Sequence, residues 1–304
     1  MTIAICIATF RRPTGLRALL RSLSAVASAC GTGHSVVVVV CDNDADASAR
    51  AITAEEAAAC PWEIRYVVEP RRGIAQARNA AVRASAPCPF LAFIDDDEIP
   101  DAQWLQQLLL TQQQFDADVV AGPVLPSFHP HAPRWARVGG FYQRGRYRTG
   151  QAIAKAVTGN VLVRSSVSAG LGGFNECFGL TGGEDSQFFL RAAGAGYRMV
   201  WCDEALVHEP VDEDRTTLKW LVRRAYQGGS NQARVEMTLG APRRAGLVRA
   251  LKGAAHMGHS IVRLPFSPFA GTAGVVREFH RFSLGLGMVG GACGITLEPY
   301  RNTR

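Results

Sequence analysis

Three aspartates stand in direct succession after an apolar run. The segment 89–100 reads PFLAFIDDDEIP and places Asp95, Asp96 and Asp97 together. Adjacent carboxylates repel one another unless a cation neutralises them, and a hard divalent ion with oxygen ligands is well suited to that. The alternative is an acidic loop in solvent or a helix N-cap, because Asp101 directly precedes the next apolar segment.

Two further kinds of side chain could do chemistry. Glu184 and Asp185 precede SQFFLRAAGAG, which has helical character, so they could supply a general base or simply cap the helix. His208 ends the predicted strand RMVWCDEALVH, where a functional role and a surface position are both open. His129 and His131 have the spacing of a metal pair but no acid or cysteine nearby, so we interpret HPHAP as a loop.

The elements that must position these residues alternate between strands and helices. Apolar runs rich in β-branched residues predict buried strands, and stripes at helical spacing predict helices between them. This alternation predicts an α/β fold with a doubly wound, mostly parallel sheet flanked by helices. The predicted strands span 2–9, 34–44, 63–70 and 89–100, and the predicted helices span 14–29, 48–59 and 73–85.

Polar residues follow the ends of three of these strands. They occupy Thr9–Arg12, Asp42–Asp46 and Asp95–Glu98. Ligands of open α/β sheets bind beyond the carboxyl ends of the strands, so these clusters are expected to share one binding rim. Arg71 and Arg72 could lie near a bound diphosphate or form a solvated basic turn.

The second half of the chain is less regular. It predicts strands over 117–126 and 156–167, a loop, helix and strand over 172–210, and a helix beyond 215. The irregular stretch 127–150 carries aromatic and arginine side chains that could bind a carbohydrate, or it could be a surface lid.

Composition excludes several classes of protein. The chain has 304 residues, of which 47% are hydrophobic, enough for one large domain or two smaller ones. No run of about 18 apolar residues predicts a membrane span, and no basic residue precedes the first apolar run as in a secretory signal. The eight cysteines are scattered without metal-ligand spacing, so we expect reduced thiols in a cytosolic protein.

Five segments of the chain, in the same order as in the family, resemble the family-2 glycosyltransferases with the GT-A fold. IAICIATFRRP resembles the opening strand and nucleotide loop, VVVVVCDND the second strand with its base-contacting Asp, and GIAQARNAAVRAS the family's Gly…Ala-Arg-Asn helix. FIDDDEIP resembles the metal-binding DxD strand end. The segment GGFNECFGLTGGEDSQFFLRAAGAGYRMVWCDEALVHEP resembles the acceptor segment with its Glu-Asp pair. The resemblance covers residues 3–210 and is greatest to sugar transferases of bacterial exopolysaccharide (succinoglycan-type) assembly.

The resemblance implies which residues hold a nucleotide-sugar. Thr9, Arg11 and Asp42 would lie against the base, and Arg78 near the base or diphosphate. Asp95 would face the ribose and diphosphate, and Asp96 is a further nucleotide-sugar-binding candidate. It also implies a divalent metal, Mn²⁺ or Mg²⁺, bound directly by Asp97 with Asp95 and His208 as further candidates. Asp185 would be the catalytic base, and Glu184 the less favoured candidate for that role.

The implied reaction is inverting, metal-dependent transfer of one sugar to a saccharide acceptor, with a lipid-linked acceptor expected. A UDP-sugar is the expected donor, and GDP and dTDP remain open. The QxxRW signature of processive synthases is absent, since the corresponding helix reads LKWLVRRAYQGG. Residues 1–100 would form the nucleotide-sugar half, 101–214 the acceptor and catalytic half, and 215–304 a helical, basic C-terminal extension.

The excess positive charge lies in the C-terminal tail. Residues 242–304 hold nine Lys and Arg against two Glu. Basic and acidic side chains are equal in number in residues 1–241, so the whole net charge of +7 comes from this tail. Residues 282–297 carry no charge, and the apolar residues of 275–282 alternate with basic ones. We expect peripheral attachment to an anionic membrane at the cytoplasmic face of the inner membrane. A helical subdomain packed on the catalytic core is the alternative.

Two other functions were weighed against glycosyl transfer. A phosphotransferase of the haloacid-dehalogenase type also ends a strand in DxD, but usually its first strand, and here Asp97 is followed by Glu98. A non-enzymatic basic protein could bind nucleic acid or a membrane through the tail, yet that leaves the acidic rim unexplained. We therefore expect no nucleic-acid partner.

Overall fold

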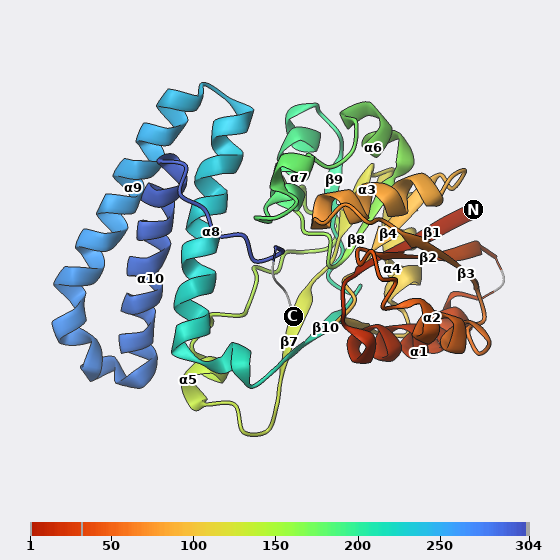
Figure 1. Cartoon of the computed structure of the whole chain (residues 1–304), viewed down its shortest axis with the longest axis horizontal. Coiled ribbons are helices and arrows are strands. Elements are labelled where there is room, and N and C mark those ends of the chain that lie inside the picture. The colour runs from red at the N-terminus through yellow and green to blue at the C-terminus, as the bar shows by residue number, and fades with distance from the viewer. Residues whose placement is uncertain (1, 32, 302–304) are drawn as a thin grey trace. The chain divides into compact units, whose positions relative to one another are not determined.

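The computed structural model of the chain describes residues 2–31 and 33–301 (Figure 1). The chain forms two compact units. The first comprises Met1–Leu125, Arg144–Glu209 and Pro299–Arg304, and the second comprises Pro126–Gln143 and Pro210–Glu298.

A seven-stranded sheet in the order β3-β2-β1-β4-β8-β6-β9 forms the centre of the first unit. Strands β1 to β4 run parallel, β8 is antiparallel to both of its neighbours, and β6 and β9 are parallel. The mostly parallel α/β sheet predicted from the alternating pattern is therefore confirmed. Its strands are β1 (Thr2–Thr9), β2 (Ser35–Asp42), β3 (Glu63–Val68), β4 (Phe90–Phe93), β6 (Val119–Ala121), β8 (Val161–Arg164) and β9 (Met199–Trp201).

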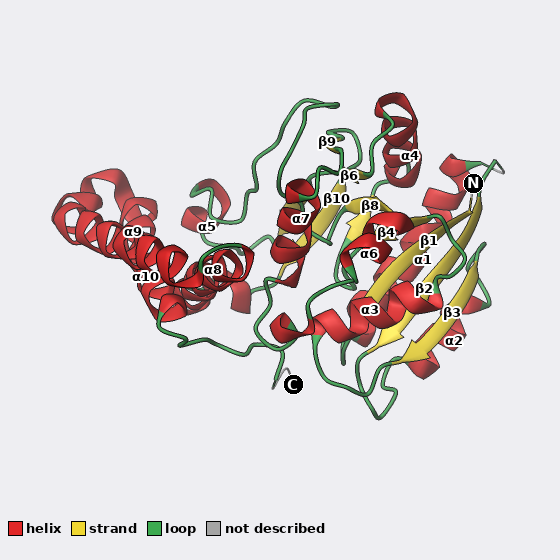
Figure 2. Ribbon diagram, turned by 90° about the horizontal axis from the view of Figure 1, so that it is seen from above, coloured by secondary structure: helices red, strands yellow, loops and turns green. Residues whose placement is uncertain are grey.

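Helices cover both faces of this sheet (Figure 2). Alternate side chains of β1 and β2 enter two separate cores, as the two-residue period of a strand requires. Ile5 and Val38 pack with one set of helices, and Ala4 and Val39 pack with the other. The first set is α1 (Pro13–Cys30), α2 (Arg50–Ala57) and α4 (Trp104–Phe115), and the second is α3 (Ile74–Ala84), α6 (Ser165–Leu171) and α7 (Glu184–Gly194).

Three predicted strands differ from the structure by more than two residues, while those predicted over 34–44 and 63–70 each end two residues too late. The predicted strand 89–100 ends at Phe93, because the Glu98 carboxylate accepts the backbone N–H of Asp95 and closes a turn. Residues beyond that turn pair in a different sheet, of order β5-β10-β7. Likewise 117–126 divides between two strands, and 156–167 ends in α6. The small sheet contains β5 (Ile99–Pro100), β7 (Val124–Phe128) and β10 (Val207–Val211).

The second unit is built on three long helices. These are α8 (Leu218–Leu239), α9 (Pro242–Arg263) and α10 (Gly271–Ala292), with α5 (Arg134–Val138), η2 (Asp214–Thr216) and η3 (Leu264–Ala270) beside them, while η1 (Glu176–Phe178) belongs to the first unit. None of the helices within 2–31 and 33–301 has both the length and the apolarity that a membrane span needs.

Glycines of α10 let the three helices approach closely. A Cβ at Gly287 would meet the backbone carbonyl of Tyr226 in α8, and one at Gly285 would lie 2.5 Å from the carbonyl of Gly253 in α9. The uncharged stretch 282–297, for which we predicted membrane attachment, is thus partly packed inside the helical unit. Ser283 and Met288 are buried there together with these glycines.

Gly287→Ala is expected to destabilise the helical unit by about 1–3 kcal/mol, because the added methyl group overpacks a backbone contact. The matched control is Gly258→Ala in α9, where a Cβ would meet nothing within 4 Å. That change should stabilise the helix by up to about 1 kcal/mol through helix propensity. Urea unfolding of both variants measures the difference, and equal stabilities would contradict this account of the packing.

Candidate active site

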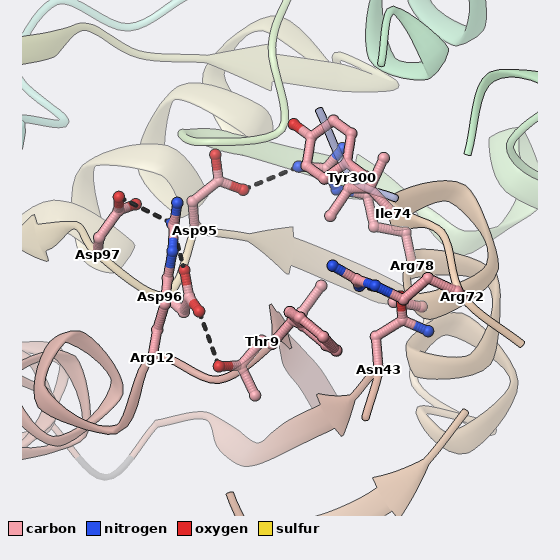
Figure 3. A pocket seen from close by; sticks show the side chains of 13 residues that line it. Thr9, Arg12, Asn43, Arg72, Ile74, Arg78, Asp95, Asp96, Asp97 and Tyr300 are labelled. Carbon is pink, nitrogen blue, oxygen red and sulfur yellow. Dashed lines mark hydrogen bonds and ion pairs between the residues drawn. The ribbon is translucent and has the colours of Figure 1, made fainter. Parts of the chain in front are cut away.

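A pocket opens where the strand order reverses. The chain runs outward from β1 to β2 and β3, then returns to place β4 on the other side of β1. Ligands of doubly wound sheets bind beyond the strand ends at such a switch point. Figure 3 shows the pocket, which is lined by Ala8, Thr9, Phe10, Arg12, Asn43, Arg72, Ile74, Ala77, Arg78, Asp95, Asp96, Asp97 and Tyr300.

Arg12 joins two of the three aspartates. Its guanidinium donates to Asp96 at 3.1 Å and to Asp97 at 2.9 Å, and the hydroxyl of Thr9 donates to Asp96 at 2.7 Å (Figure 3). Burial raises the pKa of Asp96 to about 6, and Arg12 opposes that rise. Asp97 stays partly exposed, with 23% of its side chain accessible, so its carboxylate can still reach a ligand in the pocket.

Arg78 of α3 joins the third aspartate to the acidic start of α7. The buried guanidinium donates to Asp95 at 2.8 Å and forms a second ion pair with Glu184. Burial raises the pKa of Glu184 while the charge of Arg78 lowers it. Arg78 therefore connects the predicted nucleotide site with the predicted base region.

Arg78→Met is expected to lower the free energy of unfolding by about 3–5 kcal/mol, because it leaves the Glu184 carboxylate buried without its cation. The double variant Arg78→Met, Glu184→Leu should recover most of that loss, since two packed apolar groups replace the ion pair. Arg83→Met on the same helix is the control. Arg83 is 60% exposed in its pair with Glu69, so its loss should cost at most about 1 kcal/mol. Urea denaturation tests all three, and a single variant as stable as the double would refute the argument.

The third arginine of the pocket, Arg72, lies over an aromatic ring. The guanidinium of Arg72 lies 3.2 Å from the centre of the Phe10 ring and donates to Asn43 at 2.8 Å. Asn43 also accepts the backbone N–H of Gly73 at 2.7 Å and donates to the carbonyls of residues 69 and 71. Asn43 thus fixes the loop that carries Arg72. Arg71 turns away to pair with Glu69 and Glu176.

The acidic rim fits a divalent ion that is shared with a substrate. Within residues 2–31 and 33–301, no three His, Cys, Asp or Glu side chains converge as a complete metal site. Mg²⁺ and similar ions are usually held by one or two carboxylates together with substrate phosphates. Asp95 and Asp97 supply two pocket carboxylates that are 42% and 23% exposed, and oxygen is the donor that these ions prefer.

The structure brings Thr9, Arg78, Asp95, Asp96 and Asp97 to the pocket lining and places the other predicted residues outside it. Arg11 is exposed and pairs with Asp44 at 2.7 Å. The Asp42 carboxylate is completely buried and accepts from the backbone N–H groups of residues 44 and 49 and from the hydroxyl of Tyr66.

Asp185 and His208 lie on elements that flank the pocket. Two glycines with φ of 75° and 95° lead into α7, a left-handed conformation that favours glycine, and Asp185 follows in the first turn. Burial lowers the pKa of Arg78, but the charges of Asp95, Glu184 and, more weakly, Asp185 raise it above its usual value. His208 pairs in register with Ile99, two residues after Asp97, and contacts Asp101 at 3.0 Å.

Three residues of the lining that carry polar side chains had no role assigned from the sequence. Arg12 and Asn43 lie within the polar clusters that it had drawn at the strand ends, so the signal was present but the individual residues were not chosen. Tyr300 had no signal, because it reaches the pocket from the end of the chain. Its backbone N–H donates to the carbonyl of Leu180 at 3.2 Å.

Comparison with known proteins identifies the family of the chain. The profile of glycosyl transferase family 2 matches residues 4–171, which is more than half of the chain. The chain belongs to glycosyltransferase family 2. This glycosyltransferase is 39% identical over 240 residues to the succinoglycan biosynthesis protein ExoM of Rhizobium meliloti, covering 77% of this chain and 74% of ExoM. The resemblance drawn from the motifs is therefore confirmed, and neither the phosphotransferase nor the nucleic-acid alternative is favoured.

Solved structures show the same fold. The mannosyltransferase PcManGT of Pyrobaculum calidifontis, solved with GDP-Man and Mn²⁺, matches with a TM-score of 0.60 at 16% identity over 93% of this chain and 86% of its own. S. aureus TarS 1–349 in complex with UDP matches with a TM-score of 0.51 at 14% identity, over 97% and 92% of the two chains. The glycosyltransferase spans only 39% of the longer TarS chain.

Proposed function

We propose that this enzyme transfers a single sugar, with inversion, from a nucleoside diphosphate sugar to a saccharide acceptor in polysaccharide or glycan biosynthesis. The observation that carries the proposal is one pocket at the switch point of the sheet that combines Asp95 and Asp97 with Arg12, Arg72 and Arg78. Carboxylates suit a divalent ion, and arginines suit the oxygens of a diphosphate. A nucleoside diphosphate needs both.

Four charged residues of the pocket have a direct part in this proposal. Asp97 and Asp95 would hold Mn²⁺ or Mg²⁺, with His208 as a further candidate, and the ion when bound supplies positive charge that stabilises the departing diphosphate. Arg72 and Arg78 would bind the diphosphate oxygens as charged hydrogen-bond donors. Arg72 is held in place for this by Phe10 and Asn43.

The base region fits attack by an acceptor hydroxyl. An inverting transfer needs a base that removes the hydroxyl proton as its oxygen attacks the anomeric carbon. We assign this to Asp185, which is half-buried at the start of α7, because Glu184 is committed to Arg78. In this scheme residues 1–100 bind the donor and 101–214 bind the acceptor.

We further propose UDP as the donor nucleotide and a lipid-linked saccharide as the acceptor. TarS was solved with UDP and PcManGT with GDP-Man, so GDP remains the second candidate. The name of the relative ExoM supports an acceptor of exopolysaccharide assembly. We place the enzyme in the cytoplasm as a peripheral protein of an anionic membrane, attached through its basic C-terminal part.

Thermal unfolding against UDP, GDP and dTDP, with and without Mn²⁺, tests the donor site. A ligand that binds only the folded state raises the midpoint by mass action. We expect UDP with Mn²⁺ to give the largest shift and to lose it when the metal is chelated with EDTA. A shift that is equal for all nucleotides and indifferent to the metal would contradict the proposed site.

A further inference from the structure

Helix α9 exposes an apolar stripe that the second unit leaves uncovered. Its inner side buries Gly246, Gly253 and Ser260, while its outer side exposes Leu247, Leu251 and Ile261 to 62–63%. Positions 247, 251, 254, 258 and 261 follow helical spacing and are leucine, alanine, glycine or isoleucine, so they share one apolar face.

The turn after α9 continues this stripe. In η3, the sequence LPFSPFA exposes Phe266 to 67% and Phe269 to 92%, and Val262 just before it is 68% exposed. Large apolar side chains exposed together are unusual on a free soluble surface and mark a site of interaction. We call Leu247, Leu251, Ile261, Val262, Phe266 and Phe269 the α9–η3 face.

The charges around this face indicate which kind of partner it binds. From Met237 to Arg277 the chain contains no Asp or Glu, yet it contains five arginines besides Lys252. Two of these are paired, Arg249 with Glu236 and Arg263 with Glu278, whereas Arg244 and Lys252 are exposed beside the stripe. A second copy of the chain would bring like charges together, which is unfavourable. A surface that is both apolar and anionic would match the apolar stripe and the basic residues at once.

We propose that the α9–η3 face docks on an anionic lipid bilayer, with Phe266 and Phe269 inserted among the lipids and the basic residues at the headgroups. This inference rests on the membrane attachment stated above but not on the proposed reaction. It moves the attachment from the 282–297 stretch, whose glycines pack inside the unit, to a face that the sequence did not single out.

Flotation of the full chain with vesicles tests the proposal. We expect binding to phosphatidylglycerol vesicles at low salt, weaker binding at high salt, and little binding to pure phosphatidylcholine. Phe266→Ser, Phe269→Ser should lower partitioning at least tenfold. The control Leu110→Ser, Val138→Ser removes apolar side chains that are 50% and 67% exposed elsewhere, and it should float as the unchanged chain does.

Each contrary result has a defined meaning. Failure of the unchanged chain to float, or flotation of the double serine variant at full strength, overturns the proposal. Light scattering without vesicles gives a second test: a dimer that Phe266→Ser, Phe269→Ser converts to monomer would make the face a self-association surface instead. The nucleotide-induced shift in unfolding midpoint should be the same in all variants. Its absence from a chain that floats would count against the proposed donor site and leave the membrane surface standing.

Discussion

Asp97→Ala is expected to reduce transfer by roughly 10²–10⁴-fold and to abolish the metal-dependent part of nucleotide binding, because the charge stabilisation of a bound ion amounts to several kcal/mol. Asp97 lines the pocket with 23% of its side chain accessible, and it pairs with Arg12, whose side chain is 46% exposed. Removing it should therefore leave the fold intact. Calorimetric titration of UDP, with Mn²⁺ and with EDTA, measures the effect.

The matched control is Glu63→Ala. Glu63 is also a carboxylate paired with an arginine, Arg65, but it is 64% exposed at the start of β3 and outside the pocket lining. Its removal should change neither binding nor transfer. Should Asp97→Ala bind UDP with unchanged affinity and unchanged dependence on Mn²⁺, the assignment of the acidic rim to the metal would be lost.

The sequence predicted the parts of the fold that local pattern determines. Runs such as 3–8 and 36–41 are apolar throughout because helices cover both faces of a parallel sheet, and the strands predicted over 2–9 and 34–44 are present as β1 and β2. The pattern could not locate the end of β4, since Ile94 is as apolar as a strand residue. That end depends on the turn held by Glu98, a contact between a side chain and the backbone.

The site was predictable to the level of clusters but not of every residue. The strand-end rule predicted one shared rim for Thr9 and the three aspartates, and all four line one pocket. It could not distinguish Asp42 from Asn43, because it does not say which of two neighbours lines the pocket. The Asp42 carboxylate accepts the hydroxyl of Tyr66 away from the pocket, whereas Asn43 is part of the lining. Tyr300 and the α9–η3 face depend on tertiary packing and leave no local pattern.

Asp185→Asn is expected to lower the rate of transfer by about 10²–10⁴-fold, the usual contribution of a general base, while nucleotide binding stays unchanged. The amide matches the carboxylate in size and can still accept the N–H of Ser186, which the carboxylate accepts at 2.6 Å. The start of α7 should therefore keep its conformation. Transfer assayed by release of nucleoside diphosphate, beside nucleotide titration, separates the two effects.

Glu184→Gln distinguishes the two neighbouring carboxylates. It removes the charge that Arg78 meets in the buried pair, so its main effect should appear as lost stability in urea unfolding rather than as lost chemistry. If instead Glu184→Gln stays folded and binds UDP but cannot transfer, while Asp185→Asn turns over normally, the base is Glu184. The ion pair with Arg78 would then have to open during each reaction cycle, and the proton acceptor would lie on the buried side of the helix start.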